Sequence, residues 1–113
     1  MCTQNQAILI LNEVYISCDK IFNHKVRDAF LYGSYARGDY HSESDVDILL
    51  TVNMTIEEIS KYRNSVAAVS SRLSFEFDVT VSVTVKPAEH FEKFAEVLPY
   101  YKNVLAEGIK YAG

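Results

Sequence analysis

Acidic side chains are concentrated in one short stretch of this sequence. Asp39, Glu43, Asp45 and Asp47 lie within nine positions, in a chain with 15 acidic and 11 basic residues. If Asp45 and Asp47 begin a strand, they leave the same face about 6.6 Å apart along the backbone. Two such carboxylates can share a hard divalent cation such as Mg²⁺, which prefers oxygen ligands and keeps some of its waters. The pair therefore predicts a metal site that also receives substrate phosphates.

A third carboxylate would complete such a site. Two ions about 3.5–4 Å apart can clamp the attacking and leaving oxygens of an in-line displacement. Apolar and polar residues alternate from Phe75 to Val85, which predicts a long strand with Glu76 and Asp78 on its polar face. We favour Asp78 as the third acid, because an acid in mid-strand runs against the preference of that state. Glu76 is the alternative, although it can equally be a solvated charge.

Residues upstream of the acids could bind phosphate. Gly33 and Ser34 follow a predicted strand and open a predicted helical turn. Gly33 permits close approach of the backbone, and Ser34 offers a hydroxyl and an amide to a phosphate oxygen. Arg37, one turn further on, can neutralise a phosphate, although a lone arginine can also be an ordinary solvated side chain. Without this context, Asp45 and Asp47 could be capping residues of a loop.

The elements that must position these residues follow from the hydrophobic pattern. Apolar residues at steps of three and four predict amphipathic helices, and short runs rich in branched residues predict strands. The predicted elements are helix 4–22, strand 29–32, a helical turn within 33–44, strand 45–52, helix 55–73, strand 75–85, a helix from 87 to 98 and a restart at Pro99 that ends near Gly108. This order indicates an α/β fold with a mixed sheet flanked by helices.

Length and composition restrict the class of protein. A chain of 113 residues with 49% apolar and 23% charged residues is typical of one globular domain, here 1–113. No run approaches the roughly 20 apolar residues of a membrane span, and the start lacks a signal peptide. Cys2 and Cys18 have no metal-ligand spacing and suit a reducing compartment, so we expect a cytoplasmic protein. The net charge of −4 does not favour direct nucleic-acid binding.

The segment GSYARGDYHSESDVDILL resembles the signature of the DNA polymerase β-like nucleotidyltransferase superfamily. In particular, it resembles the minimal nucleotidyltransferase (MNT) branch. The resemblance covers nearly the whole chain, including the leading helix, the strand expected to hold Asp78 and the tail PYYKNVLAEGIKYAG. It implies a polymerase β-like fold, ATP as the nucleoside triphosphate donor, Mg²⁺ as cofactor, with two ions, and release of pyrophosphate.

The resemblance also assigns a role to each matched residue. The implied metal ligands are Asp45, Asp47 and Asp78, the last of these as third ligand or general base, and the implied triphosphate contacts are Gly33, Ser34 and Arg37.

Members of the MNT branch are similar to the antitoxin half of two-gene modules whose toxin is a HEPN-domain ribonuclease. Some of them adenylylate a tyrosine of that toxin, so the resemblance implies AMP transfer to a tyrosine of a HEPN partner. The alternative is a non-catalytic module that neutralises a HEPN partner by occlusion. A small-molecule acceptor is less favoured, because the chain has no second domain to form a pocket. The acceptor is therefore expected to be held by a partner protein or by a second copy of the chain.

Overall fold

The computed structural model describes residues 2–111, so Met1, Ala112 and Gly113 of the predicted domain lie outside the described residues. A four-stranded sheet in the order β3-β2-β1-β4 forms its centre. The strands are β1 (Val26–Tyr32), β2 (Val46–Val52), β3 (Val81–Pro87) and β4 (Ile109–Lys110). Strand β1 is antiparallel to β2 and β4, whereas β2 and β3 are parallel. The predicted mixed sheet is confirmed.

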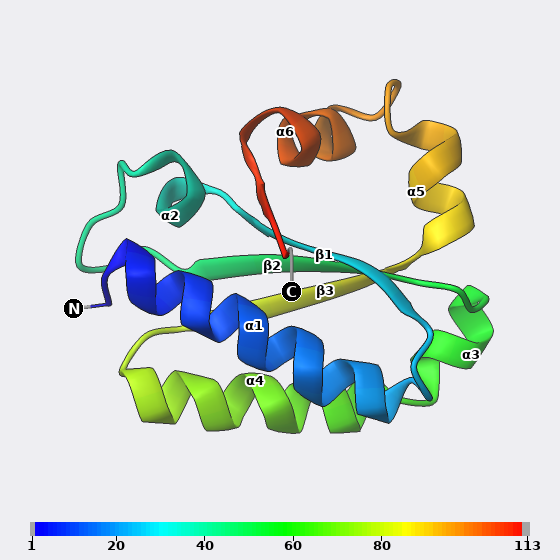
Figure 1. Cartoon of the computed structure of the whole chain (residues 1–113), viewed down its shortest axis with the longest axis horizontal. Helices are drawn as coiled ribbons and strands as arrows, with labels where there is room; N and C mark the ends of the chain where they lie inside the picture. The colour runs from blue at the N-terminus through cyan, green and yellow to red at the C-terminus, as the bar shows by residue number, and fades with distance from the viewer. Residues whose placement is uncertain (1, 112–113) are drawn as a thin grey trace.

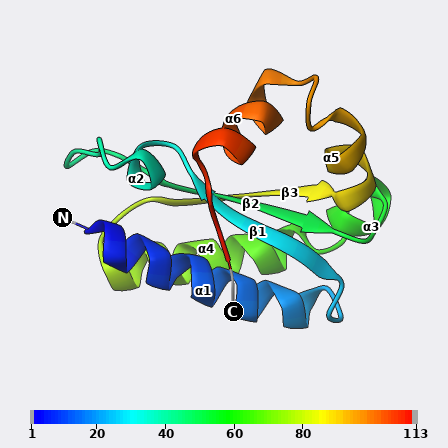
Figure 2. The same ribbon diagram turned by 45° about the horizontal axis from the view of Figure 1, so that its top comes forward.

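Helices cover both faces of this sheet (Figure 1). They are α1 (Gln4–Ile21), α2 (Ser34–Arg37), α3 (Ile56–Ser60), α4 (Arg63–Phe77), α5 (Ala88–Phe94) and α6 (Pro99–Glu107). Helices α1 and α4 lie side by side on one face, and α5 and α6 lie on the other, as Figure 2 also shows. Within residues 2–111, no helix is both long and apolar enough to cross a membrane.

The side chains of β2 divide the core into two clusters, because alternate residues of a strand point to opposite faces. Val46, Ile48 and Leu50 belong to the larger cluster, with buried residues of α1 and α4. Leu49 belongs to the smaller cluster, with buried residues of α5 and α6. Asp47 alternates with its neighbours in the same way, so it faces the side of the sheet that carries α5 and α6.

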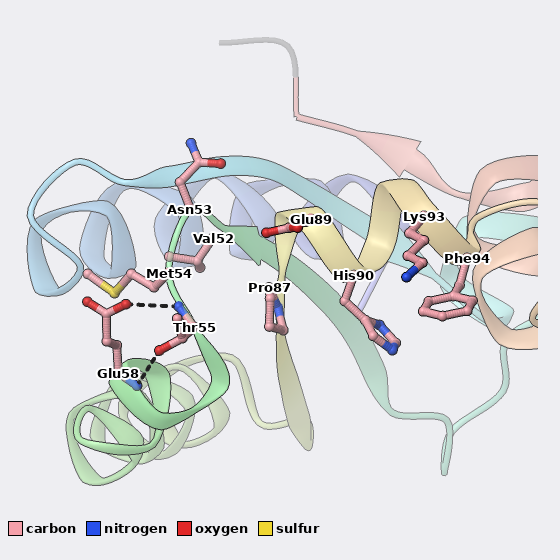
Figure 3. Close-up of a pocket in the computed structure, with 10 residues that line it drawn as sticks. All are labelled: Val52, Asn53, Met54, Thr55, Glu58, Pro87, Glu89, His90, Lys93 and Phe94. Carbon is pink, nitrogen blue, oxygen red and sulfur yellow. Dashed lines mark hydrogen bonds between the residues drawn. The ribbon is translucent and has the colours of Figure 1, made fainter.

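The predicted helix 55–73 consists of two helices in the structure. A capping box begins the first of them: the Thr55 hydroxyl accepts from the Glu58 amide at 3.2 Å, and the Glu58 carboxylate accepts from the Thr55 amide at 3.0 Å (Figure 3). Helix α3 ends at Ser60 after little more than one turn, and α4 begins at Arg63. The capping box therefore fixes the start of α3 but not the longer helix.

The predicted strand 75–85 is wrong over its first half. Helix α4 continues to Phe77, and Asp78 ends it in the left-handed conformation, with φ 52° and ψ 50°. The chain reaches the sheet only at Val81, where the Val81 amide donates to the Ser74 hydroxyl at 2.9 Å. Asp78 is therefore not a strand residue.

Helical spacing explains this error. Val66, Val69, Leu73 and Phe77 recur at steps of three and four, and all four contribute to the larger core cluster. Phe75, the apolar residue that made the alternation look continuous, has 93% of its surface exposed. The period of two is therefore genuine only from Val79 onward, and the two phenylalanines belong to a helix.

The remaining elements differ from expectation at their ends. Strand β1 begins three residues before the predicted strand 29–32, and β2 begins at Val46, one residue after Asp45. Helix α5 ends at Phe94, and the restart at Pro99 is confirmed as α6. After Gly108 the chain forms β4, which pairs with β1 through Ile109 and Lys110.

Candidate active site

Asp45 and Asp47 lie at the start of β2. Asp45 is exposed just before the strand, and Asp47 is half-buried within it. The pKa of the Asp47 carboxyl is raised above its usual value, first by burial and then by the negative charge of Asp45. The positive charge of Arg37 opposes this rise. The two carboxylates therefore interact electrostatically, as their spacing predicts.

Gly33 lies directly against the carboxylate of Asp47. Its backbone has φ 78° and ψ −155°, a region that essentially only glycine occupies. A Cβ built at Gly33 would be 2.7 Å from the Asp47 carboxylate oxygen Oδ2, which is closer than real Cβ atoms come. The close approach predicted for this glycine is made here by a carboxylate. The chain thereby brings the predicted phosphate-binding motif and the acidic pair into contact.

Helix α2 is the single turn predicted after Gly33. The Gly33 carbonyl accepts from the amides of Ala36 and Arg37, each at 3.1 Å. Tyr35 is buried, and the side-chain amide of Gln4 donates to its carbonyl at 2.9 Å. The turn is therefore attached to α1 and holds Gly33 and the half-buried Ser34 next to the acidic pair.

Arg37 is engaged by two carboxylates outside the acidic pair. Its Nε donates to Asp39 at 3.2 Å, and its Nη1 donates to Glu107 of α6 at 3.1 Å. All three side chains are exposed to solvent. A phosphate that binds Arg37 must therefore compete with these two ion pairs.

The two acids considered as third ligand do not lie beside Asp47 on the sheet. Asp78 is exposed in the connection between α4 and β3, where it lines a hollow with Asp45 and Phe75. Glu76 lies in α4 and forms an ion pair with Arg72, one turn before it, at 3.6 Å. Among residues 2–111, no group of three His, Cys, Asp or Glu side chains is arranged to hold a metal. The described part of the chain therefore does not bring the three predicted carboxylates together, because Asp78 ends a helix and does not project from the sheet.

The residues that do flank Asp47 were not singled out from the sequence. Asp47 pairs with Tyr32 on β1 and with Ser82 on β3. The Tyr32 hydroxyl accepts a hydrogen bond of 2.9 Å from Tyr100 of α6. Burial, and then this contact, raises the pKa of Tyr100 well above its usual value, so its hydroxyl stays protonated. For Ser82 a signal existed, because the alternation places Thr80, Ser82 and Thr84 on the polar face of the strand.

Neither cysteine has the surroundings of a nucleophile. Cys2 and Cys18 are both free and buried. Burial raises the pKa of the Cys18 thiol to about 12, so it is not ionised at neutral pH. Burial also raises the pKa of the Cys2 thiol. Both thiols therefore stay protonated and pack as small apolar groups.

A separate pocket of about 560 Å³ lies at the other end of β2 (Figure 3). It is lined by Val52 and Pro87 at the ends of β2 and β3, by the segment between β2 and α3, and by residues of α3 and α5, among them Glu58 and His90. Val52 is five residues from Asp47 along the strand, or about 16 Å. This pocket is therefore distinct from the acidic pair.

Residues 17–97 match the family model described as "Polymerase beta, Nucleotidyltransferase". The chain belongs to this nucleotidyltransferase family. Two relatives in Methanocaldococcus jannaschii are named "Putative protein adenylyltransferase MJ0141" and "Putative protein adenylyltransferase MJ0604". The first is 37% identical over 68% of this chain and 76% of its own length. The second is 31% identical over 77% of this chain and 79% of its own length.

Solved structures of toxin–antitoxin complexes share the fold of this chain. A complex with AMP-PNP has a TM-score of 0.55 and 22% identity, with 88% of this chain and 72% of that chain covered. A variant of the MntA-HpeT complex has a TM-score of 0.55 and 21% identity, with 100% of this chain and 74% of that chain covered. The fold and the enzyme class expected from the signature are confirmed: the chain is a nucleotidyltransferase.

Proposed function

We propose that this nucleotidyltransferase transfers AMP from ATP to a hydroxyl group of a protein acceptor, with Mg²⁺ as cofactor. The contact between the Asp47 carboxylate and the backbone of Gly33 carries this proposal. It joins a pair of metal-binding side chains to a backbone that can approach phosphate closely. The names of the two archaeal relatives support AMP as the transferred group and a protein as the acceptor.

The donor set fits a hard cation. Asp47 provides carboxylate oxygens at a half-buried position and Asp45 at an exposed one, and the burial of Asp47 together with the repulsion between the two acids favours a bound positive charge. When bound, Mg²⁺ neutralises the triphosphate and orients it. Gly33, Ser34 and Arg37 contact the triphosphate, and Arg37 exchanges its ion pairs with Asp39 and Glu107 for phosphate oxygens.

The reaction is a displacement at the α-phosphorus. The acceptor oxygen forms a bond to this phosphorus, the bond to the bridging oxygen of the β-phosphate breaks, and pyrophosphate leaves. The acceptor hydroxyl passes its proton to a carboxylate of the site or to water. Asp78 lines the same hollow as Asp45, so we place it on the acceptor side of the site and not among the metal ligands.

The acceptor we propose is a tyrosine of a HEPN-domain toxin, which makes the chain an antitoxin. The resemblance to the MNT branch supports this acceptor, and the shared fold with toxin–antitoxin complexes agrees with it. Apolar side chains around α6 are available for a partner, since Val97 and Leu105 are 68% and 49% exposed.

The experiment combines the purified chain, the product of its neighbouring gene, Mg²⁺ and ATP labelled in the α-phosphate. We expect an AMP-sized mass gain on a tyrosine of the partner. Asp45→Asn and Asp47→Asn should abolish it, whereas Glu43→Gln, an exposed acid of the same loop, should retain it. Circular dichroism checks that each variant is folded. If both asparagine variants still neutralise the partner fully, occlusion is the function and transfer is not.

A further inference from the structure

Within the described chain, the sheet leaves only two positions from which a neighbouring strand could add a ligand beside Asp47. They are Tyr32 on β1 and Ser82 on β3, the two residues in register with it. Paired residues of adjacent strands lie about 4.8 Å apart and point to the same face. Val81 belongs to the core cluster on the opposite face and Val83 packs against that cluster, which agrees with this orientation for Ser82. Ser82 is exposed, so its side chain is open to a ligand.

Neither position supplies a negative charge. The Tyr32 hydroxyl is engaged with Tyr100 at 2.9 Å. The Ser82 hydroxyl is neutral, and its neighbours in the same alternation, Thr80 just before β3 and Thr84 within it, are neutral too. A second divalent cation next to the first would therefore meet strong repulsion without an additional protein carboxylate to offset it.

Acidic residues elsewhere near the site have other positions or partners. Asp78 precedes β3 by three residues, and its left-handed backbone turns the chain away from the helix axis at that point. Glu107 and Asp39 contact Arg37, and among residues 2–111 neither is grouped with Asp45 and Asp47 in a metal-binding arrangement. In the part of the chain that the structure describes, no three potential ligands form a metal cluster. Two carboxylates are thus what this site offers.

We infer that the site binds a single divalent cation, held by Asp45, Asp47 and the nucleotide phosphates, and that Ser82 occupies the position from which a second cation would need a carboxylate. This inference rests on the proposed function and replaces the expectation of two ions. It also makes the number of ions depend on one exposed side chain, which can be changed without disturbing the core.

Manganese(II) is a suitable probe, because two such ions about 3.5–4 Å apart couple magnetically and lose the hyperfine pattern of an isolated ion. The full chain is titrated with Mn²⁺ and followed by electron paramagnetic resonance, in the presence of an equal amount of α,β-methylene ATP. The same nucleotide without protein is the blank. We expect one bound ion per chain and an isolated-ion spectrum.

Two variants at one position provide the comparison. Ser82→Asp should raise the count from one ion to two and produce the spectrum of a coupled pair. Ser82→Asn, which matches aspartate in shape but lacks its charge, should keep one isolated ion. A melting curve of each variant confirms that it is folded, and the count for the unchanged chain stands even if one is not.

Contrary results separate the inference from the function on which it rests. A coupled pair in the unchanged chain would overturn the single-ion site while leaving nucleotide transfer intact. A folded Ser82→Asp protein that still binds one ion would overturn the assignment of Ser82. If the unchanged chain leaves the Mn²⁺ spectrum identical to that of the nucleotide blank, and Mn²⁺ with nucleotide does not change its melting temperature, the proposed function fails together with the inference.

Discussion

The contact between Gly33 and Asp47 combines two separate constraints. Gly33 has a backbone conformation that other residues avoid, and it also leaves no room for a side chain beside the carboxylate. Gly38, which ends the same helical turn, has a left-handed backbone with φ 91°. Among residues 2–111, however, no atom beyond its chain neighbours lies within 4 Å of the point where a Cβ of Gly38 would be. Substitution of Gly38 therefore introduces backbone strain alone, whereas substitution of Gly33 introduces backbone strain and a steric clash.

Gly33→Ala should lower the free energy of unfolding by about 1–3 kcal/mol and remove the stabilisation by Mg²⁺ and ATP, because the new methyl group displaces Asp47. Gly38→Ala should cost about 1–2 kcal/mol for its backbone alone and keep that stabilisation. Urea unfolding and melting curves with and without saturating Mg²⁺-ATP measure both effects. A Gly33→Ala protein that Mg²⁺-ATP still stabilises fully would argue against a role of this contact in binding.

The raised pKa of Asp47 makes stability depend on pH in a defined direction. A carboxyl whose pKa is higher in the folded than in the unfolded chain binds more protons when folded, so stability falls as pH rises from the unfolded value to the folded one. Asp47→Asn removes this loss. Without metal, we expect the variant to melt above the unchanged chain at pH 7 but close to it near pH 3, below the usual carboxyl pKa of about 3.9. If Asp47→Asn and the unchanged chain melt at the same temperature at pH 7 as well as at pH 3, Asp47 carries no such penalty.

At the scale of elements, the connection from α4 to β3 shows where sequence patterns stop being informative. Amphipathic periodicity predicted α1, and short apolar runs predicted β1 and β2, to within three residues at each end, whereas the predicted helix 55–73 is divided into α3 and α4. Phe75, Phe77 and Val79 alternate with a period of two. Phe77 also continues the helical spacing of Leu73, and only packing decides between the two patterns. Phe77 packs against the core cluster, whereas Phe75 does not. The helix therefore continues, and Asp78 is lost from the strand.

The part of the candidate site that is close in sequence was predictable, and the part that depends on tertiary packing was not. Gly33, Ser34, Asp45 and Asp47 are close in sequence, so local patterns bring them together. Ser82 lies beside Asp47 only through the parallel register of β2 and β3, which no local pattern contains. The pairing of Arg37 with Glu107 spans 70 residues and depends on where α6 docks.

Asp78→Gly should stabilise the protein, because Asp78 holds a left-handed conformation at the end of a helix, where glycine is preferred. We expect a gain of about 0.5–1 kcal/mol in the free energy of unfolding. Glu76→Gly, two residues earlier within α4, should instead cost about 1 kcal/mol. Urea denaturation of both variants measures the two changes. A loss of stability on Asp78→Gly would indicate a contact of this carboxylate that outweighs its backbone.

At the scale of the whole molecule, the ion pair between Arg37 and Glu107 joins α2 to α6, the last helix. Because Arg37 must leave this pair to contact phosphate, Glu107→Gln should tighten ATP binding a few-fold at low salt. Glu96→Gln, which removes an exposed acid without this pairing, is the control. Binding of a fluorescent ATP analogue at low and high salt measures the effect, which should shrink as salt screens the pair. Weaker binding by Glu107→Gln would show that the pair positions Arg37 for phosphate.

Strand β3 forms one edge of the sheet, and its sequence favours self-association when it is exposed. Residues 79–85 read VTVSVTV, an uncharged run of strand-forming residues without glycine or proline. Such segments stack into cross-β fibrils when they are exposed. In the native fold, Lys86 and Pro87 are the last residues of β3, where a charge and a proline on an edge strand disfavour pairing with a further strand. We expect a peptide of residues 79–85 to form thioflavin-positive fibrils, and the Ser82→Asp peptide to remain soluble, because a central charge blocks stacking. The serine proposed to limit the site to one cation thus also leaves this segment able to self-associate once the chain unfolds.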